Sequence, residues 1–288
     1  MKIKSSHLKL AWNAVVGHIY KLILMIKDIP TLHPTILSNP DIIVSLTSYG
    51  RRVEETVYYT ILSILHQTKR PDRIILWLDS DNWNEKNIPS KLQLLKEHGV
   101  EIRFCEDIRS YKKLIPTLRL FPDSIIITVD DDVIYKKSLI ENLYNSYLRD
   151  TSKIYCTRAY NIPIKDHKPL PYKNWVNYHG YSATQPILFP VGVGGILYPP
   201  NSLAHEVLNA NRFMKICPSA DDIWFWIMAR LKGTEHCFVP MDYSFYSFDA
   251  IYQAMHRGSA LTHSNVGERN NDEQMKNALD AYNEVVLG

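Results

Sequence analysis

Short apolar stretches alternate with amphipathic segments over residues 41–158. The stretches are four to six residues long and predict buried strands at residues 41–46, 73–78, 100–104, 124–129 and 154–157. Between them, apolar residues recur three or four positions apart, which predicts helices over residues 53–65, 89–98, 111–120 and 138–148. Pro116 is expected to break or kink the third of these helices. This alternation indicates an α/β protein with a mostly parallel central sheet flanked by helices.

Polar residues follow three of the predicted strands. Thr47 to Arg52 follow the first strand, Asp79 ends the second, and Asp130 to Asp132 follow the fourth. Right-handed crossovers place the carboxyl ends of parallel strands at one edge of the sheet. Ligands of open α/β sheets bind beyond that edge. These residues are therefore expected to converge on one site.

Asp130, Asp131 and Asp132 place three carboxylates next to one another directly after an apolar strand. Their mutual repulsion requires a cation or strong hydrogen-bond donors nearby. Hard oxygen ligands suit Mg²⁺ or Mn²⁺, which are typically held by one or two carboxylates together with substrate phosphates. The alternative is a solvated turn that caps a helix ahead of Ser138.

Residues 8–26 form a separate amphipathic segment. Its apolar residues recur on one side of a predicted helix, and lysines at positions 2, 4, 9, 21 and 27 surround it. Polar interruptions leave it short of the ~20 apolar residues needed to cross a bilayer, and no small-residue cleavage site marks it as a signal peptide. Either the helix lies in a membrane interface or it packs against protein. Residues 1–40 are thus predicted as this helix and a proline-containing linker.

The overall composition narrows the classes of function. The chain has 288 residues and a net charge of only +3 without a basic cluster, which argues against nucleic-acid binding. Its four cysteines form no C-x-x-C pair, so we expect free thiols in a reducing, cytoplasmic compartment. Residues 160–200 are rich in Pro, Tyr and Gly without periodicity, and a loop-rich region of this length is usually functional.

Several segments together resemble one enzyme family. The run from Ile126 to Tyr135 is similar to the D-x-D segment of the GT-A glycosyltransferases. The segments at 44–49, 67–68, 75–79 and 111–114 are similar to those of the bacterial family 2-like members. The resemblance covers roughly residues 41–265. It implies a single GT-A (Rossmann-like) catalytic domain over 41–288, with a nucleotide-sugar-binding half at 41–158 and an acceptor-side half at 159–288.

The resemblance also implies an activity. A sugar would move from a UDP- or GDP-sugar to the hydroxyl of a saccharide or lipid-linked saccharide, in the assembly of a surface polysaccharide such as capsule, O-antigen or LPS. The cofactor would be Mn²⁺ or Mg²⁺. The enzyme would be cytoplasmic, with the segment 8–26 as the candidate for peripheral contact with the inner face of the cell membrane.

The resemblance assigns roles on the donor side residue by residue. Asp132 is expected to bind the metal, Asp130 to face the ribose and join the metal ligands, and Asp131 to assist. The remaining donor-side candidates are Thr47, Tyr49 and Asp79 for the nucleoside, Arg52 with Lys112 or Lys113 for the phosphates, and Gly194 and Gly195 near the transferred sugar. The two glycines also fit a plain turn or bulge, and each basic residue also fits a solvated surface charge.

On the acceptor side, Asp221 and Asp222 open a predicted apolar helix. Ser219 with Asp222 fits a capping box, which would be purely structural. By the resemblance, Asp222 is the general base of an inverting transfer and Asp221 orients the acceptor. The resemblance also points to a late histidine as a further metal ligand, for which His263 is favoured over His256.

Two rival functions remain. A nucleotidyltransferase that makes a nucleotide-sugar needs a glycine-rich basic loop after the first strand, where this chain has only residues 49–52. A non-catalytic carbohydrate-binding protein on the same fold is the other alternative. A phosphatase of the D-x-D-x-T/V type is disfavoured, because its aspartates would follow the first strand.

Overall fold

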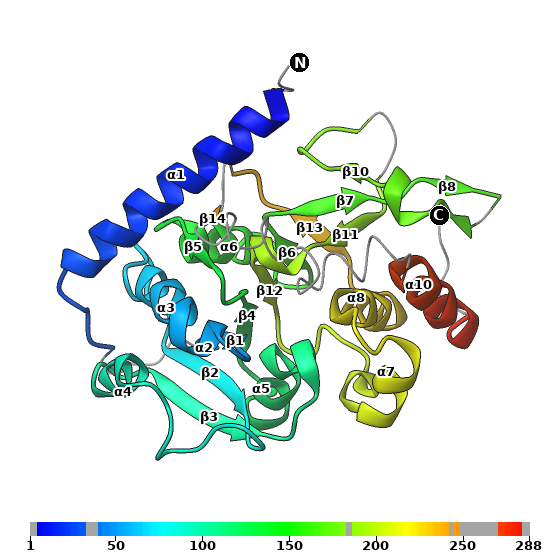
Figure 1. The fold of residues 1–288 in the computed structure, drawn as a ribbon. Coiled ribbons are helices and arrows are strands. Elements are labelled where there is room, and N and C mark those ends of the chain that lie inside the picture. The colour runs from blue at the N-terminus through cyan, green and yellow to red at the C-terminus, as the bar shows by residue number, and fades with distance from the viewer. Residues whose placement is uncertain are drawn as a thin grey trace.

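The computed structural model describes residues 5–32, 40–166, 168–182, 186–241, 245–247 and 270–283. Its centre is a seven-stranded sheet in the order β13-β6-β12-β4-β1-β2-β3 (Figure 1). These strands are β1 (Ile42–Thr47), β2 (Arg73–Asp79), β3 (Glu101–Cys105), β4 (Ile125–Thr128), β6 (Ile154–Cys156), β12 (Ile196–Tyr198) and β13 (His236–Phe238). β12 runs antiparallel to both of its neighbours, and the other pairings are parallel. The mostly parallel sheet of a GT-A fold is thus confirmed.

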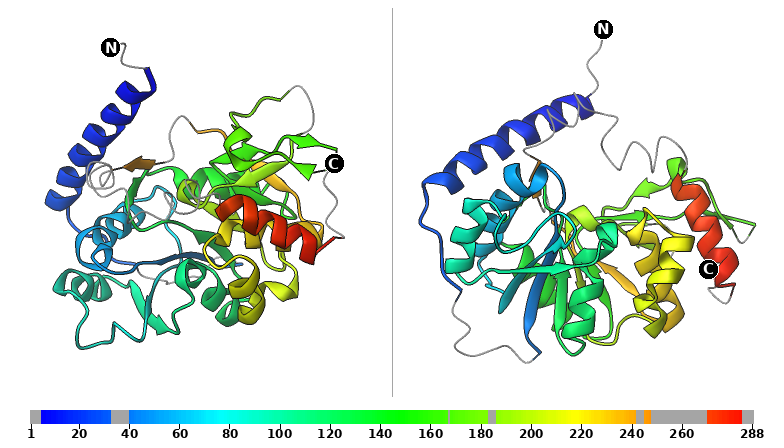
Figure 2. Two further views of the ribbon diagram at one scale, coloured as in Figure 1. Left: turned by 45° about the vertical axis from the view of Figure 1, so that its right-hand side comes forward. Right: turned by 60° about the horizontal axis from the view of Figure 1, so that its bottom comes forward.

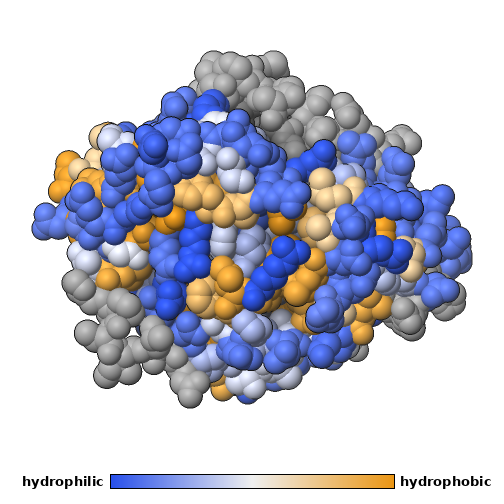
Figure 3. All heavy atoms as spheres, turned by 90° about the horizontal axis from the view of Figure 1, so that it is seen from below, coloured by the Kyte–Doolittle hydropathy of each residue, from blue (hydrophilic) through white to orange (hydrophobic). Residues whose placement is uncertain are grey.

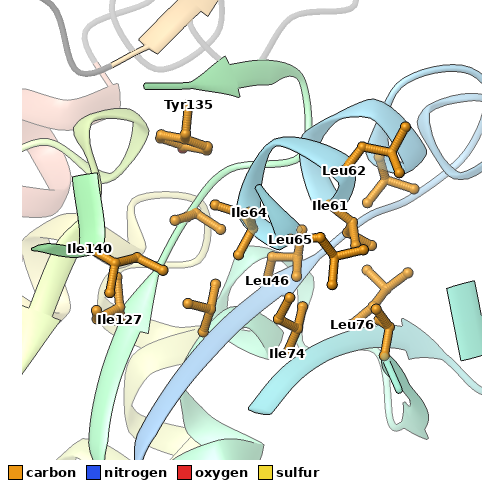
Figure 4. Packing of buried hydrophobic residues seen from close by; sticks show 14 of the residues in the cluster. Leu46, Ile61, Leu62, Ile64, Leu65, Ile74, Leu76, Ile127, Tyr135 and Ile140 are labelled. Atoms are coloured by element: carbon orange, nitrogen blue, oxygen red, sulfur yellow. The ribbon is translucent and has the colours of Figure 1, made fainter. Parts of the chain in front are cut away.

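Helices cover both faces of this sheet, as the right-hand view of Figure 2 shows. One face carries α3 (Val57–Leu65), α4 (Ser90–Glu97) and α6 (Leu139–Tyr147), and the other carries α5 (Ile115–Leu120), α7 (Ala210–Ile216), α8 (Asp221–Lys232) and α10 (Asn270–Ala281). The strands are apolar on both sides because both sides are buried. In β4, Ile125 and Ile127 join the core shown in Figure 4, whereas Ile126 joins the core under α8.

Two predicted helices differ from the structure at their boundaries. The segment 53–65 is split at Thr56 into α2 (Arg52–Glu55) and α3. The segment 111–120 is interrupted at Leu114, between the 3-10 helix η1 (Arg109–Lys113) and α5. The predicted break at Pro116 was therefore wrong: Pro116 occupies the first turn of α5, where a missing N–H costs no helical hydrogen bond.

The region without periodicity forms short strands and 3-10 turns. β7 (Ala159–Asn161), β10 (Val176–Asn177) and β11 (Leu188–Pro190) make a small antiparallel sheet, and β8 (Ile164–Lys165) pairs with β9 (Lys168–Pro169). The 3-10 turns are η2 (Tyr172–Asn174), η3 (Gly192–Gly194) and η4 (His205–Leu208). Seen from below, polar side chains cover most of the molecule and apolar atoms appear in short stretches between them (Figure 3).

The amino-terminal segment forms α1 (Ser5–Ile26), so the predicted helix is confirmed. It runs along one side of the molecule (Figures 1 and 2) and contacts α3 and a two-stranded ribbon of β5 (Val133–Tyr135) and β14 (Phe245–Ser247). Among the described residues, no helix combines the length and apolarity needed to cross a membrane.

Candidate active site

The carboxyl ends of three adjacent parallel strands define the site edge. β1 lies between β4 and β2, with Ser45 opposite Thr128 and Thr47 opposite Trp77. Asp130 therefore follows β4 at the same edge where β1 ends at Thr47 and β2 ends at Asp79. The structure thus brings to one edge the residues that strand alternation predicted to meet.

The middle aspartate of the triplet is held by the loop after β1. Ser48 Oγ donates a hydrogen bond to Asp131 Oδ2 (2.6 Å), and Arg52 Nη1 donates to Asp131 Oδ1 (2.9 Å). The second terminal nitrogen of Arg52, Nη2, lies 3.1 Å from Asp132 Oδ2. Burial raises the pKa of the Asp131 carboxyl, and Arg52 and the Ser48 hydroxyl oppose that rise. Arg52 thus supplies the positive charge that the triplet was expected to require.

Lys113 joins the donor-side aspartates to the acidic pair on α8. Its Nζ lies 3.3 Å from Asp130 Oδ1, 3.0 Å from Asp221 Oδ2 and 3.9 Å from Asp222 Oδ1. Burial lowers the pKa of this ammonium, but the carboxylates of Asp130, Asp221 and Asp222 outweigh burial and hold it well above its ordinary value. One buried cation therefore balances carboxylates from two distant parts of the chain.

Gly192 completes the surroundings of Asp222. Its backbone N–H donates to Asp222 Oδ2 at 3.1 Å. A Cβ at this position would lie 2.8 Å from Lys113 Nζ, 3.0 Å from Asp222 Oδ1 and 3.5 Å from Asp130 Oδ1. A side chain at position 192 would therefore intrude between the three groups and displace Lys113 or Asp222, so glycine preserves this arrangement.

Asp222 is partly buried and can bind a proton near neutral pH. Burial raises its pKa to about 7; Lys113 opposes this rise, whereas Asp221 and Asp130 add to it. Its Oδ1 has no hydrogen-bond donor within the described part of the chain, while Oδ2 is fixed by Gly192. A carboxylate that is oriented through one oxygen and has no hydrogen bond on the other can accept a proton near neutral pH.

The start of α8 is not a capping box. The residue before the helix is Ala220, which makes no side-chain cap hydrogen bond. Instead Gln274 of α10 accepts hydrogen bonds from the backbone N–H groups of Ser219 (2.9 Å) and Ala220 (3.1 Å), and its Nε2 donates to Ser219 Oγ. The capping alternative was therefore wrong. The distant Gln274 accepts hydrogen bonds from these N–H groups, and Asp222 accepts instead from the N–H of Gly192.

The other donor-side candidates differ in their partners. Thr47 Oγ1 donates to the Trp77 carbonyl (2.9 Å), and buried Asp79 accepts from the backbone and side chain of Asn82. Tyr49 is exposed, with the Arg52 guanidinium 5.4 Å from its ring centroid. Lys112 pairs with Asp107 rather than with the triplet, so of the two adjacent lysines it is Lys113 that reaches Asp130.

The strand register adds a residue that the sequence did not single out. Ile196 of β12 pairs with Thr128 on one side and Cys156 on the other, and Gly194, two residues before Ile196, lies against Arg158. A Cβ on Gly194 would lie 2.5 Å from Arg158 Cβ, so glycine is required there for packing. Gly195 adopts a φ of +88°, which favours glycine for a second reason. Arg158 belongs to no local sequence motif, and only the pairing of β12 shows that it lies at the site.

Aromatic residues extend the site on the acceptor side. Tyr160, Tyr172 and Trp175 form a cluster, with ring centroids 4.6 Å apart for the last two. Burial raises the pKa of Tyr172, and the charges of Asp222 and Arg158 also act on its hydroxyl. Trp175 is buried in the core under α8 and both tyrosines are partly buried against it, so these rings pack on one another beside Asp222.

The structure describes only part of the proposed metal site. His263 and His256 lie outside the described residues. Within the described ranges, no three His, Cys, Asp or Glu side chains are grouped as metal ligands. Asp130 and Asp132 nevertheless offer hard carboxylate oxygens at one edge, which matches the one or two carboxylates that a Mg²⁺-type ion shares with phosphates.

Comparison with known proteins identifies the family. Residues 43–198, more than half of the chain, match the model of glycosyl transferase family 2. The chain belongs to this family, and membership supports glycosyl transfer as its activity. A search of curated proteins gives no match.

Solved structures with a similar arrangement include TarS from S. aureus, at 13% identity and a TM-score of 0.45, covering 85% of this chain and 72% of that one. CMP:2-keto-3-deoxy-manno-octonic acid synthetase complexed with CTP is similar at 10% identity and a TM-score of 0.45, and the match covers 76% of this chain and 98% of that one. 4-diphosphocytidyl-2C-methyl-D-erythritol synthase is similar at 11% identity and a TM-score of 0.47, and the match covers 76% of this chain and 99% of that one.

Proposed function

We propose that this protein transfers a sugar from a UDP- or GDP-sugar to an acceptor hydroxyl with inversion, and that Asp222 is the general base. The observation that carries the proposal is the position of Lys113 between Asp130 and the pair Asp221–Asp222. The donor-side and acceptor-side carboxylates thereby lie around one ammonium group. A donor bound at Asp130 and an acceptor bound at Asp222 would meet there.

The metal is part of this proposal. Asp130 and Asp132 are the residues that would hold Mn²⁺ or Mg²⁺ together with the donor diphosphate, and His263 stays a proposed further ligand. When bound, such an ion stabilises the negative charge of the departing nucleoside diphosphate. Arg52, which lies 3.1 Å from Asp132, can add a positive charge next to the same phosphates.

The reaction is a single displacement. The acceptor oxygen forms a bond to the anomeric carbon as the bond from that carbon to the diphosphate oxygen breaks. Asp222 Oδ1 takes the hydroxyl proton, and the electron pair of the broken bond leaves with the diphosphate. The hydrogen bond from the Gly192 N–H and the ion pairs of Lys113 with three carboxylates hold Asp222 in a fixed orientation during this step.

Further parts of the proposal concern the substrates and the cellular setting. Thr47, Tyr49 and Asp79 are proposed to line the nucleoside pocket, Asp131 to support its neighbours, and Gly194 and Gly195 to face the transferred sugar. The acceptor is proposed to be a saccharide or lipid-linked saccharide of a surface polysaccharide. The site is proposed to act on the cytoplasmic side, with contact to the membrane through residues 8–26.

The nucleotidyltransferase alternative is disfavoured by the loop after β1. Residues 49–52 contain one glycine, Gly50, and two basic residues, of which Arg51 pairs with Glu55. A nucleotidyltransferase would need a glycine-rich basic loop here to bind a triphosphate. A purely carbohydrate-binding role gives no reason for a buried Asp222 Oδ1 that has no hydrogen bond within the described part of the chain.

The test is turnover of a panel of UDP- and GDP-sugars with Mn²⁺, with and without saccharide acceptors. We expect Asp132→Ala to abolish donor turnover and Asp222→Asn to reduce sugar transfer by about 10²–10⁴-fold. Asp123→Ala, on an exposed turn before β4, is the control and should match wild type. Full activity in Asp132→Ala or Asp222→Asn would remove the role assigned to that residue.

A further inference from the structure

Helix α1 has two opposite faces with different surroundings. One face rests on the protein: Leu24 is buried, the Tyr20 ring stacks on Tyr246 with centroids 4.9 Å apart, and Lys21 Nζ lies 4.3 Å from the centroid of the Tyr59 ring. At roughly 100° per residue, these positions occupy one side of the helix.

The other face is an apolar stripe that the described protein leaves uncovered. It consists of Trp12, Val15, Ile19, Leu22 and Ile26, each of which exposes 50–86% of its surface. Their spacing of three and four residues places them in a row on the side opposite Leu24. Contiguous exposed apolar residues of this size mark a contact surface rather than ordinary solvent-exposed surface.

The charge of the helix indicates what covers the stripe. Ser5–Ile26 contains no acidic residue, and Lys9 and Lys21 lie within it. Lys2 and Lys4 precede it, Lys27 follows it, and the first acidic residue of the chain is Asp28. A second copy would bring two helices of the same positive charge together, and neither helix contains an acidic residue. An anionic lipid surface accepts both the apolar stripe and the positive charge.

The position of α1 connects this surface to the candidate site. Tyr246, on which Tyr20 stacks, lies on β14 and pairs with Ile134 of β5. β5 begins directly after Asp132, and Tyr135 at its end carries the hydroxyl that accepts from the backbone N–H of Asp130. α1 therefore packs against the same ribbon that leads out of the aspartate triplet.

We propose that the outward stripe of α1 docks on an anionic membrane and holds the candidate site beside it, so that the acceptor is a lipid-linked molecule. The docking stands independently of the catalytic assignment, whereas the acceptor class rests on the proposed function. The contact is peripheral: the apolar stripe enters the interface and the opposite face keeps its contacts with β5 and β14.

The experiment is co-sedimentation of the full chain with vesicles of phosphatidylcholine, alone or with a quarter phosphatidylglycerol. Leu22→Glu tests the stripe, and Leu148→Glu is the matched control, because the two leucines are similarly exposed, at 63% and 58%. Wild type and Leu148→Glu should bind the anionic vesicles, and Leu22→Glu should bind at least about tenfold more weakly. Binding should fall when phosphatidylglycerol is omitted or salt is raised.

Further readouts separate docking from catalysis. A thermal melt and donor hydrolysis without vesicles should be the same for Leu22→Glu and wild type. If all three proteins lack donor hydrolysis but show the expected vesicle binding, the proposed function fails and the docking stands. Docking is overturned if wild type ignores anionic vesicles or Leu22→Glu binds as wild type does. It is also overturned if wild type is a dimer without lipid that Leu22→Glu dissociates.

Discussion

Replacing Lys113 tests the electrostatic arrangement of the site in isolation from any substrate. Lys113→Met keeps the length and apolar stem of the side chain but leaves Asp130, Asp221 and Asp222 without their shared ammonium. Breaking a buried ion pair from one side typically costs about 3–5 kcal/mol, because the remaining charge is uncompensated. We expect a loss of unfolding free energy of this size at pH 8.

The adjacent lysine provides the control. Lys112 is also buried, but its single partner, Asp107, has a side chain that is 47% exposed and can be hydrated when the lysine is lost. Lys112→Met should therefore cost no more than about 1 kcal/mol. Urea unfolding of both variants and wild type, followed by fluorescence, measures the difference.

The pH dependence of this difference provides a second check. Without Lys113, the three carboxylates repel one another most when all are ionised. Lys113 lowers the pKa of Asp222, so without it this pKa lies above the wild-type value of about 7, and as the pH falls Asp222 binds a proton and the repulsion decreases. The deficit of Lys113→Met relative to wild type should thus be larger at pH 8 than at pH 5.5. Equal losses for the two lysine variants, or a deficit that does not change with pH, would refute this reasoning.

Three further predictions concern single contacts. Gly192→Ala should lower sugar transfer by roughly 100-fold, because its Cβ would lie 3.0 Å from Asp222 Oδ1 and displace the base; a folded variant with normal kcat would contradict this. Gln274→Ala should lower the unfolding free energy by about 1–3 kcal/mol, since it removes the acceptor of the Ser219 N–H and leaves the Ala220 N–H only the Cys217 carbonyl at 3.4 Å; an unchanged urea midpoint would show that water replaces Gln274. Asp132→Asn should raise the Mn²⁺ concentration for half-maximal donor hydrolysis at least about tenfold, and an unchanged titration would exclude Asp132 as a ligand.

Much of the fold followed from local sequence pattern. β1, β2 and β4 are short and mostly apolar, and their alternation with helices was sufficient to predict a mostly parallel sheet. Because crossovers have one hand, the same pattern also predicted that Thr47, Asp79 and Asp130 share an edge. The antiparallel insertion of β12 was not predictable, since its three strand residues follow a glycine-rich turn without periodicity.

The site was less predictable because its partners are distant in the sequence. The choice between Lys112 and Lys113 depends on the turn of η1, which directs one lysine to Asp107 and the other to Asp130. Gln274 replaces the predicted capping box from a helix more than fifty residues away. Arg158 could be assigned to the site only from the register in which β12 pairs with β6. In each case tertiary packing, rather than local propensity, decides the contact.

The most direct test of Asp222 as the base is the pH dependence of sugar transfer, measured as kcat/KM between pH 5.5 and 8. Only the ionised carboxylate can take the acceptor proton, so the wild-type value should fall up to tenfold per pH unit below the pKa of about 7. Asp222→Asn should be about 10²–10⁴-fold slower and lack this fall. Wild-type transfer that stays constant down to pH 5.5, or an Asp222→Asn enzyme that keeps the wild-type rate and profile, would contradict the account.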